Sequence, residues 1–146
     1  MSQISNLIRH RRDTFAGYIF FNQTLQPMEK FISWVEIPAK DVHRAVDFYN
    51  KVLQTKLEIS DFGKEKMAGF PSGEGAISQA PDFRPSKDGA IVSFNAQGDI
   101  DGAIERIKLA GGEILTGKTK IEAEGRGYFA LFTDTEGNRM GLYGNS

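Results

Sequence analysis

The chain contains no cysteine, which excludes disulfides, thiolate metal sites, iron–sulfur clusters and thiol nucleophiles. It has only two histidines, His10 and His43, so a site built on several imidazoles would have to use both. Eighteen basic residues balance nineteen acidic ones, and a net charge of −1 provides no electrostatic footprint for nucleic acid or for an anionic membrane surface. No apolar run approaches the roughly 20 residues that span a bilayer. We therefore expect neither a nucleic-acid nor a membrane partner.

The first 27 residues differ from the rest of the chain. Basic residues at 9–12 precede a short apolar run at 15–21, as in a signal peptide, but no small-residue cleavage site follows it. We therefore expect a cytoplasmic protein. Met28 stands directly before a strong strand pattern, like an ordinary protein start. We interpret residues 1–27 as an N-terminal arm and residues 28–146 as the domain.

The chain contains an internal repeat. Residues 34–46 and 92–104 align when Asp41 is placed on Asp99, and each segment then reads as a strand, a break, an aspartate and a helical pattern. Both aspartates stand where an N-cap carboxylate accepts the free amide hydrogens of a first helical turn. After each helix the hydrophobic period changes from 3.6 to 2, with glycine-rich turns between short strands. Two βαβββ modules are predicted, at about residues 29–82 and 88–146.

The modules also carry a family resemblance. Residues 31–53 resemble the opening unit of the vicinal oxygen chelate superfamily, which includes glyoxalase I, bleomycin-resistance proteins and extradiol dioxygenases. Residues 110–115 and 130–143 resemble its second helix end and its closing hairpin. The resemblance implies an α+β fold in which two tandem βαβββ modules form a cup-shaped mixed sheet, with helices outside and a small-molecule ligand inside. It also implies a homodimer, but no reaction, because the superfamily hosts many chemistries on one scaffold.

The resemblance further implies a metal site with one His or Glu from each of four strands. The first-strand position, seven residues before the helix aspartate, is Trp34, and the same offset from Asp99 gives Val92. The closing-strand position is Gly141, and the fourth lies within residues 76–80, which include no His, Asp or Glu. Tryptophan, valine and glycine side chains do not ligate divalent cations. We therefore expect no metal and no other cofactor, and we do not expect dioxygenase activity.

Glu36 is the candidate catalytic residue. It shares the parity of Trp34, while Val35 and Ile37 face the other way, so Trp34 and Glu36 face the cup if the helix covers Val35 and Ile37. A carboxylate there could act as a general base or could bind an amine or hydroxyl of a ligand. The alternative is that Glu36 pairs with Arg139 or reaches solvent.

The same alternation predicts the rest of the ligand-binding face. Val92 and Phe94 are expected on the wall of the second module, and Arg139 and Tyr143 on the closing strand. Each aromatic side chain could instead belong to the core. An apolar wall with few polar groups suits a small hydrophobic or aromatic ligand. The predicted substrate-binding residues are Trp34, Glu36, Val92, Phe94, Arg139 and Tyr143.

Two functions remain open from the sequence. One is a glyoxalase-like small-molecule-binding protein, which needs the cup but no metal. The alternative is a lyase or isomerase of the lactoylglutathione-lyase type, either metal-independent with Glu36 as base or with a divergent metal site. His43 and Asp47 are four residues apart on one predicted helix face, and we interpret them as a solvated pair rather than as metal ligands.

Overall fold

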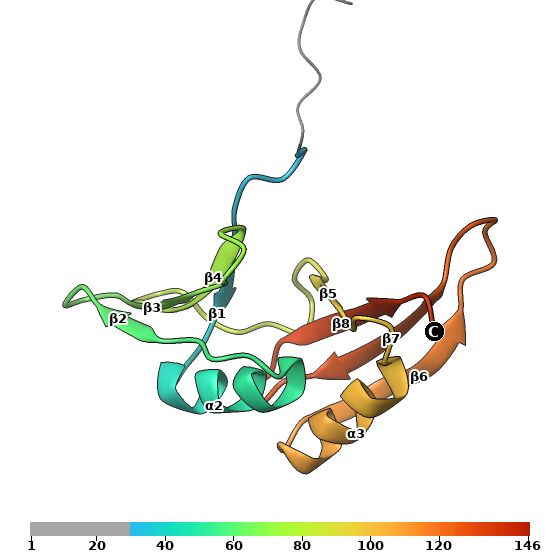
Figure 1. The fold of residues 1–146 in the computed structure, drawn as a ribbon. Helices are drawn as coiled ribbons and strands as arrows, with labels where there is room; N and C mark the ends of the chain where they lie inside the picture. The colour runs from blue at the N-terminus through green and yellow to red at the C-terminus, as the bar shows by residue number, and fades with distance from the viewer. Residues whose placement is uncertain (1–29) are drawn as a thin grey trace, which may run out of the picture. The chain divides into compact units, whose positions relative to one another are not determined.

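The structure is a computed structural model that describes residues 30–146 (Figure 1). Within it, Ser33–Ser146 form one compact unit. The expected arm, residues 1–27, lies outside the described residues. Across residues 30–146, no helix is long and apolar enough to cross a membrane.

Each half of the unit has the predicted order of elements. The first module comprises β1 (Val35–Pro38), α2 (Val42–Leu53), β2 (Ile59–Asp61), β3 (Lys66–Gly69) and β4 (Gly75–Gln79). The second comprises β5 (Ser93–Asn95), α3 (Ile100–Leu109), β6 (Glu113–Lys120), β7 (Tyr128–Thr133) and β8 (Arg139–Gly144). The α+β fold of two tandem βαβββ modules is thereby confirmed.

Hydrogen bonding divides the strands into two four-stranded mixed sheets, one in each module. Their orders are β1-β4-β3-β2 and β5-β8-β7-β6, so β1 and β5 are edge strands. Both edge strands run parallel to their neighbours β4 and β8, and the other pairs are antiparallel. The two sheets therefore repeat one topology, as the internal repeat predicts.

Both helices begin at the predicted aspartates. The Asp41 side chain accepts hydrogen bonds from the backbone N–H groups of His43 and Arg44 at 2.9 and 3.2 Å, and Asp99 accepts one from Gly102 at 2.9 Å. These carboxylates satisfy donors that the helices leave free, and they lie at the positive end of the helix dipole. Helix α2 ends at Gln54, which adopts the left-handed conformation (φ 53°) that glycine usually supplies.

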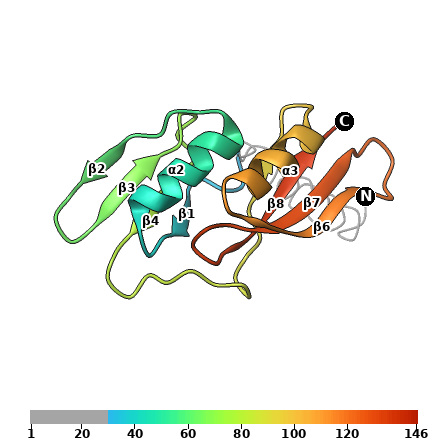
Figure 2. The same cartoon turned by 90° about the horizontal axis from the view of Figure 1, so that it is seen from below.

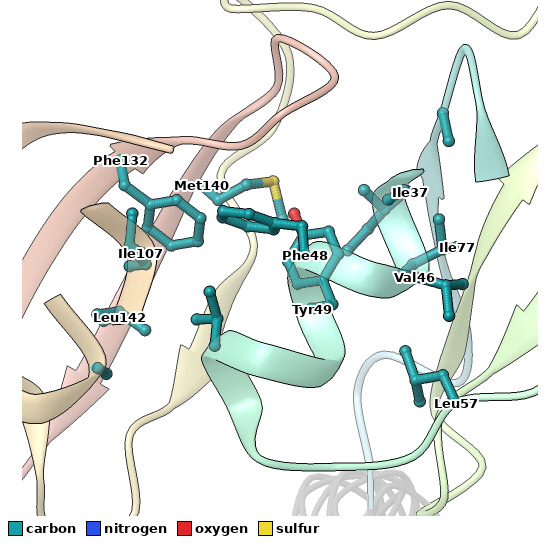
Figure 3. Close-up of a cluster of buried hydrophobic side chains, with 14 of the residues drawn as sticks. Ile37, Val46, Phe48, Tyr49, Leu57, Ile77, Ile107, Phe132, Met140 and Leu142 are labelled. Atoms are coloured by element: carbon teal, nitrogen blue, oxygen red, sulfur yellow. The ribbon is translucent and has the colours of Figure 1, made fainter. Parts of the chain in front are cut away.

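Each helix covers one face of its own sheet, and the two helices contact each other (Figures 1 and 2). The core between them is shared by both modules. Phe48 of α2 lies beside Phe132 and Met140 of the second module, with its ring 6.2 Å from that of Phe132 (Figure 3). Tyr49 meets Phe48 edge to face at 5.0 Å. Burial of these rings holds the modules together, since each aromatic side chain removes a large apolar area from water.

Polar contacts join the modules at the turn between β7 and β8, residues 134–138. One oxygen of Asp134 accepts three hydrogen bonds, each 2.9 Å long, from the backbone N–H groups of residues 136–138 in its own turn. The other oxygen accepts a hydrogen bond from the Tyr49 hydroxyl at 2.6 Å. Burial and the neighbouring Asp134 carboxylate raise the pKa of Tyr49 well above its usual value. The carboxylate thus rigidifies its own turn and fixes that turn to α2.

Glu136 and Asn138 extend this connection to the start of the first module. The carboxylate of Glu136 binds the Arg44 guanidinium through two bonds, at 2.6 and 3.0 Å, and accepts the backbone N–H of Asp41 at 2.9 Å. Burial by itself would raise the pKa of Glu136, but these bonds prevail and the pKa is lowered. The side-chain amide of Asn138 donates to the carbonyl of Pro38 at 2.8 Å.

Candidate functional site

Trp34 and Glu36 lie together on the face of the first sheet that α2 leaves uncovered. Ile37 is 2% exposed in the core, whereas Trp34 is 48% exposed. The indole Nε1 of Trp34 donates to Oε1 of Glu36 at 3.0 Å. Trp34 therefore takes the place that Arg139 would have held in the alternative interpretation of Glu36. An exposed aromatic ring and an exposed carboxylate are held side by side.

The second module has a different register from the one predicted by aligning the aspartates. Pro38 is the last residue of β1 paired with β4, opposite Ser78, and Asn95 is the last residue of β5 paired with β8, opposite Tyr143. In both modules the next backbone N–H donates to the carbonyl of that partner, at 2.9 and 2.8 Å. Asn95 is therefore the structural counterpart of Pro38.

An extra turn residue causes this shift. Asp41 follows Pro38 by three positions, but Asp99 follows Asn95 by four. The added length is accommodated by Gln97 and Gly98, both of which have positive φ, 51° and 79°. Counting back from the helix aspartate therefore misplaces the second-module strand by one residue, which turns every side chain to the other face.

With the corrected register, Ile91 is the counterpart of Trp34 and Ser93 the counterpart of Glu36. Ile91 is 42% exposed, as expected for that face. Phe94 lies on the opposite face, with its ring 5.2 Å from Tyr49 and 5.9 Å from Phe70. Val92 shares the parity of Phe94 and also packs against the core. The structure does not bring Val92 and Phe94 together with the other predicted site residues.

Arg139 and Tyr143 do lie on the face that carries Ile91 and Ser93. They alternate along β8 with Met140 and Leu142, which are buried in the core. Gly141 stands between them opposite Ser93, and a Cβ there would overlap the Ser93 hydroxyl. Glycine at this position leaves room for the Ser93 side chain in its present conformation.

Two buried polar atoms on the faces away from the helices have no hydrogen-bond partner. They are the hydroxyl of Ser78 and the Nε of Arg139, and no other buried side-chain nitrogen or oxygen of residues 30–146 is left unpaired. Sequence reasoning missed Ser78, because a serine in a buried strand carries no signal of its own. A buried donor without a partner is costly, so the two atoms point to a group outside residues 30–146.

The residues present do not fit the metal site that the family resemblance implies. Ala76 lies opposite Glu36 as Gly141 lies opposite Ser93, which makes Ala76 the fourth position that the sequence left open. Neither Ala76 nor Gly141 has a side-chain donor, and the indole of Trp34 is not a metal ligand. Residues 30–146 include no cluster of three or more His, Cys, Asp or Glu side chains that could hold a metal ion.

Comparisons with known proteins agree with this fold. The family model of the Glyoxalase/Bleomycin resistance protein/Dioxygenase superfamily matches residues 31–142. None of the curated proteins is similar enough in sequence to count as a match.

Solved structures with the same fold include TnmS3, an antibiotic binding protein from Streptomyces, which is 20% identical with a TM-score of 0.60 over 82% of this chain and 100% of that chain. A glyoxalase I mutant from Zea mays is 22% identical with a TM-score of 0.59, over 77% of this chain and 46% of that one. A glyoxalase/bleomycin resistance protein/dioxygenase family enzyme from Burkholderia phytofirmans is 14% identical with a TM-score of 0.61, over 79% and 98% of the two chains. At these identities the likeness establishes the fold alone.

Proposed function

The chain belongs to the glyoxalase/bleomycin resistance protein/dioxygenase superfamily, and we propose that it is a small-molecule-binding member that works without the superfamily's usual metal site. The ligand is small and partly apolar, and it binds on the sheet faces that the helices leave uncovered. The antibiotic-binding relative from Streptomyces supports a binding role for this fold.

The observation that carries this proposal is the hydrogen bond between Trp34 and Glu36. It fixes the indole next to the carboxylate at 3.0 Å, so a ring stacked on Trp34 lies within reach of a hydrogen-bond acceptor. Trp34 also stands at the strand position that the family resemblance assigns to a metal ligand. An indole at this position offers a flat apolar surface to a planar ligand.

Fluorescence tests the proposal directly, because Trp34 is the only tryptophan of the chain. A small aromatic amine such as benzylamine should quench or shift its emission in a saturable manner. Glu36→Gln should weaken that binding, while Glu122→Gln, in the exposed loop before β7, serves as the matched control. Unchanged emission with aromatic amines, aromatic acids and neutral aromatics alike would contradict the proposal.

One observation favours the alternative of a lyase or isomerase with Glu36 as base. Only Oε1 of Glu36 accepts a hydrogen bond within residues 30–146, so Oε2 is available to take a proton from a bound substrate. Turnover of methylglyoxal with glutathione, measured with and without added nickel or zinc, decides between the two functions. Activity that Glu36→Gln abolishes would favour the enzyme.

The expected homodimer and cytoplasmic location remain parts of the proposed function. Exposed hydrophobic side chains support self-association, since Leu109 is 88% exposed and Phe62 is 67% exposed. Sedimentation velocity at micromolar concentration should show a dimer. A monomer at that concentration would contradict this part of the proposal and leave the binding role untouched.

A further inference from the structure

We propose that the ligand carries an anionic group, bound by Arg139 and Ser78, in addition to the amine or hydroxyl bound by Glu36. The inference rests on the proposed function and narrows the substrate class to dipolar molecules, with opposite charges at the two ends of a small, largely apolar body. Neither Ser78 nor the anion is implied by the alternation pattern of the sequence.

The two unpartnered atoms lie on either side of Pro38. Ser78 is the strand partner of Pro38 in the ladder between β1 and β4. On the other side, the Pro38 carbonyl accepts the side-chain amide of Asn138, the residue directly before Arg139. One residue therefore connects a buried hydroxyl from the first module with a buried guanidinium nitrogen from the second.

The chemistry of this pair selects an anion. An arginine guanidinium only donates hydrogen bonds, and a serine hydroxyl can donate one to the same acceptor. Two unpartnered donors, one of them charged, match a carboxylate or another oxyanion. Because both atoms are shielded from water, an oxyanion placed between them would form strong charge-assisted bonds.

Residues 30–146 supply no carboxylate for Arg139. Asp134 and Glu136 are close to it in sequence, but Asp134 is occupied by its own turn and Tyr49, and Glu136 by Arg44 and Asp41. Glu36 accepts a hydrogen bond from the indole Nε1 of Trp34. Arg139 forms no ion pair with any residue from 30 to 146. Its counter-ion must come from outside this part of the chain.

The other end of the ligand, its amine or hydroxyl, binds to Glu36. Glu36 lies two residues before Pro38 on β1 and shares its face, a separation of about 7 Å along a strand. A molecule with one aromatic ring between an ammonium and a carboxylate has a comparable length. Its ammonium would lie at Glu36, next to the Nε1 of Trp34, its carboxylate at Ser78 and Arg139, and its ring between the two ends.

A matched series of four probes tests this assignment on the full chain. The probes are 4-(aminomethyl)benzoate, benzylamine, benzoate and benzamide, titrated against Trp34 fluorescence and checked by calorimetry. The dipolar probe should bind about tenfold or more tightly than benzylamine, because it adds a charge-assisted contact. Equal affinity of the dipolar probe and benzylamine would overturn the inference and leave the proposed function intact. Failure of all four probes to change the emission would contradict both.

Variants then test which residue binds each charged end of the dipolar probe. Arg139→Gln should weaken 4-(aminomethyl)benzoate and benzoate about tenfold and leave benzylamine unchanged. Glu36→Gln should weaken 4-(aminomethyl)benzoate and benzylamine and leave benzoate unchanged. Arg139→Lys should lose less affinity for the carboxylate probes than Arg139→Gln, since lysine keeps the positive charge but lacks the planar donor geometry of the guanidinium. Arg126→Gln, at an exposed arginine between β6 and β7, is the matched control.

Ser78→Ala separates ligand binding from a structural role. Removing an unpartnered buried hydroxyl should leave the melting temperature equal or higher, and should weaken both carboxylate probes severalfold without affecting benzylamine. A lower melting temperature would show that the hydroxyl serves the fold. Unchanged affinity for benzoate would show that the Ser78 hydroxyl does not bind the anionic group.

Discussion

The hydroxyl of Tyr49, on α2 of the first module, donates a 2.6 Å hydrogen bond to Asp134, in the turn before the last strand of the second. Both residues are buried, and 85 positions separate them in the chain. Together with the aromatic core around Phe48, this bond makes the two modules one cooperative unit.

Tyr49→Phe should lower the stability of the whole unit. The substitution keeps the ring and leaves a buried carboxylate oxygen with only its Asn138 bond, at a cost of about 1–3 kcal/mol. Denaturant unfolding followed by circular dichroism measures the loss. Tyr128→Phe, on a ring that contacts Lys118, is the matched control and should change stability little. Equal effects of the two variants would contradict a special role for the Tyr49 hydroxyl.

The ion pair of Glu136 with Arg44 should make the protein sensitive to acid. The pKa of Glu136 is lowered from its ordinary value near 4.5, so the folded chain binds a proton there less readily than the unfolded chain. Its contribution is therefore present above pH 4.5 and is lost as the pH falls through the lowered pKa.

Glu136→Gln should accordingly remove part of the acid dependence and cost about 1–3 kcal/mol at neutral pH, because the carboxylate is buried and Arg44 is half exposed. Unfolding free energies measured between pH 3 and pH 7 test this. Glu105→Gln, in the exposed pair with Lys108, is the control. Parallel pH curves for wild type and Glu136→Gln would refute the assignment.

Gln54→Gly should stabilise the first helix. Gln54 ends α2 with φ 53°, a conformation that disfavours side chains with a Cβ and suits glycine. We expect a gain of about 0.5–1 kcal/mol in thermal unfolding. Gln54→Ala keeps the Cβ and should give no gain, so equal changes for the two variants would point to another cause.

Gly141→Ala should disturb the contact between β5 and β8. The added Cβ would overlap the Ser93 hydroxyl, so the Ser93 side chain has to leave its present rotamer, at a cost of about 1–3 kcal/mol. The double variant Ser93→Gly with Gly141→Ala should recover much of this stability. A single variant as stable as the wild type would show that the Ser93 side chain moves aside without cost.

Residues 28–146 should fold without the preceding segment. The strand and helix signals begin after Met28, and the compact unit begins at Ser33. A chain starting at Met28 should unfold within a few degrees of the full chain. A large loss of stability would show that residues 1–27 belong to the fold.

The sequence was sufficient for the modules, for both N-caps and for the face of β1. These features depend on local sequence patterns: an aspartate directly before a helical hydrophobic repeat, and the alternation of side chains along a strand. It was insufficient for the face of β5, because one extra residue at Gln97 and Gly98 shifts the register, and such a turn has no periodic signature.

The contacts between modules were also beyond the sequence. The residues at 134–138 are recognisable as a turn, but their partners in α2, at its N-cap and at the end of β1 lie 92 to 100 positions earlier. Likewise, the hydrogen bond from Asn138 to the Pro38 carbonyl, with Ser78 opposite Pro38, depends on the packing of the two modules, which no local pattern encodes.

The position of this turn near the C-terminus has a consequence for biosynthesis. The backbone N–H of Asp41 and the carbonyl of Pro38 are hydrogen-bonded to the side chains of Glu136 and Asn138, which are translated 95 and 100 positions later. The first module is therefore synthesised well before Glu136 and Asn138. The start of α2 lacks these hydrogen bonds until the turn between β7 and β8 has formed. Contacts of such long sequence separation slow folding. The native contacts of the first module therefore become possible only after residues 134–138 have been synthesised.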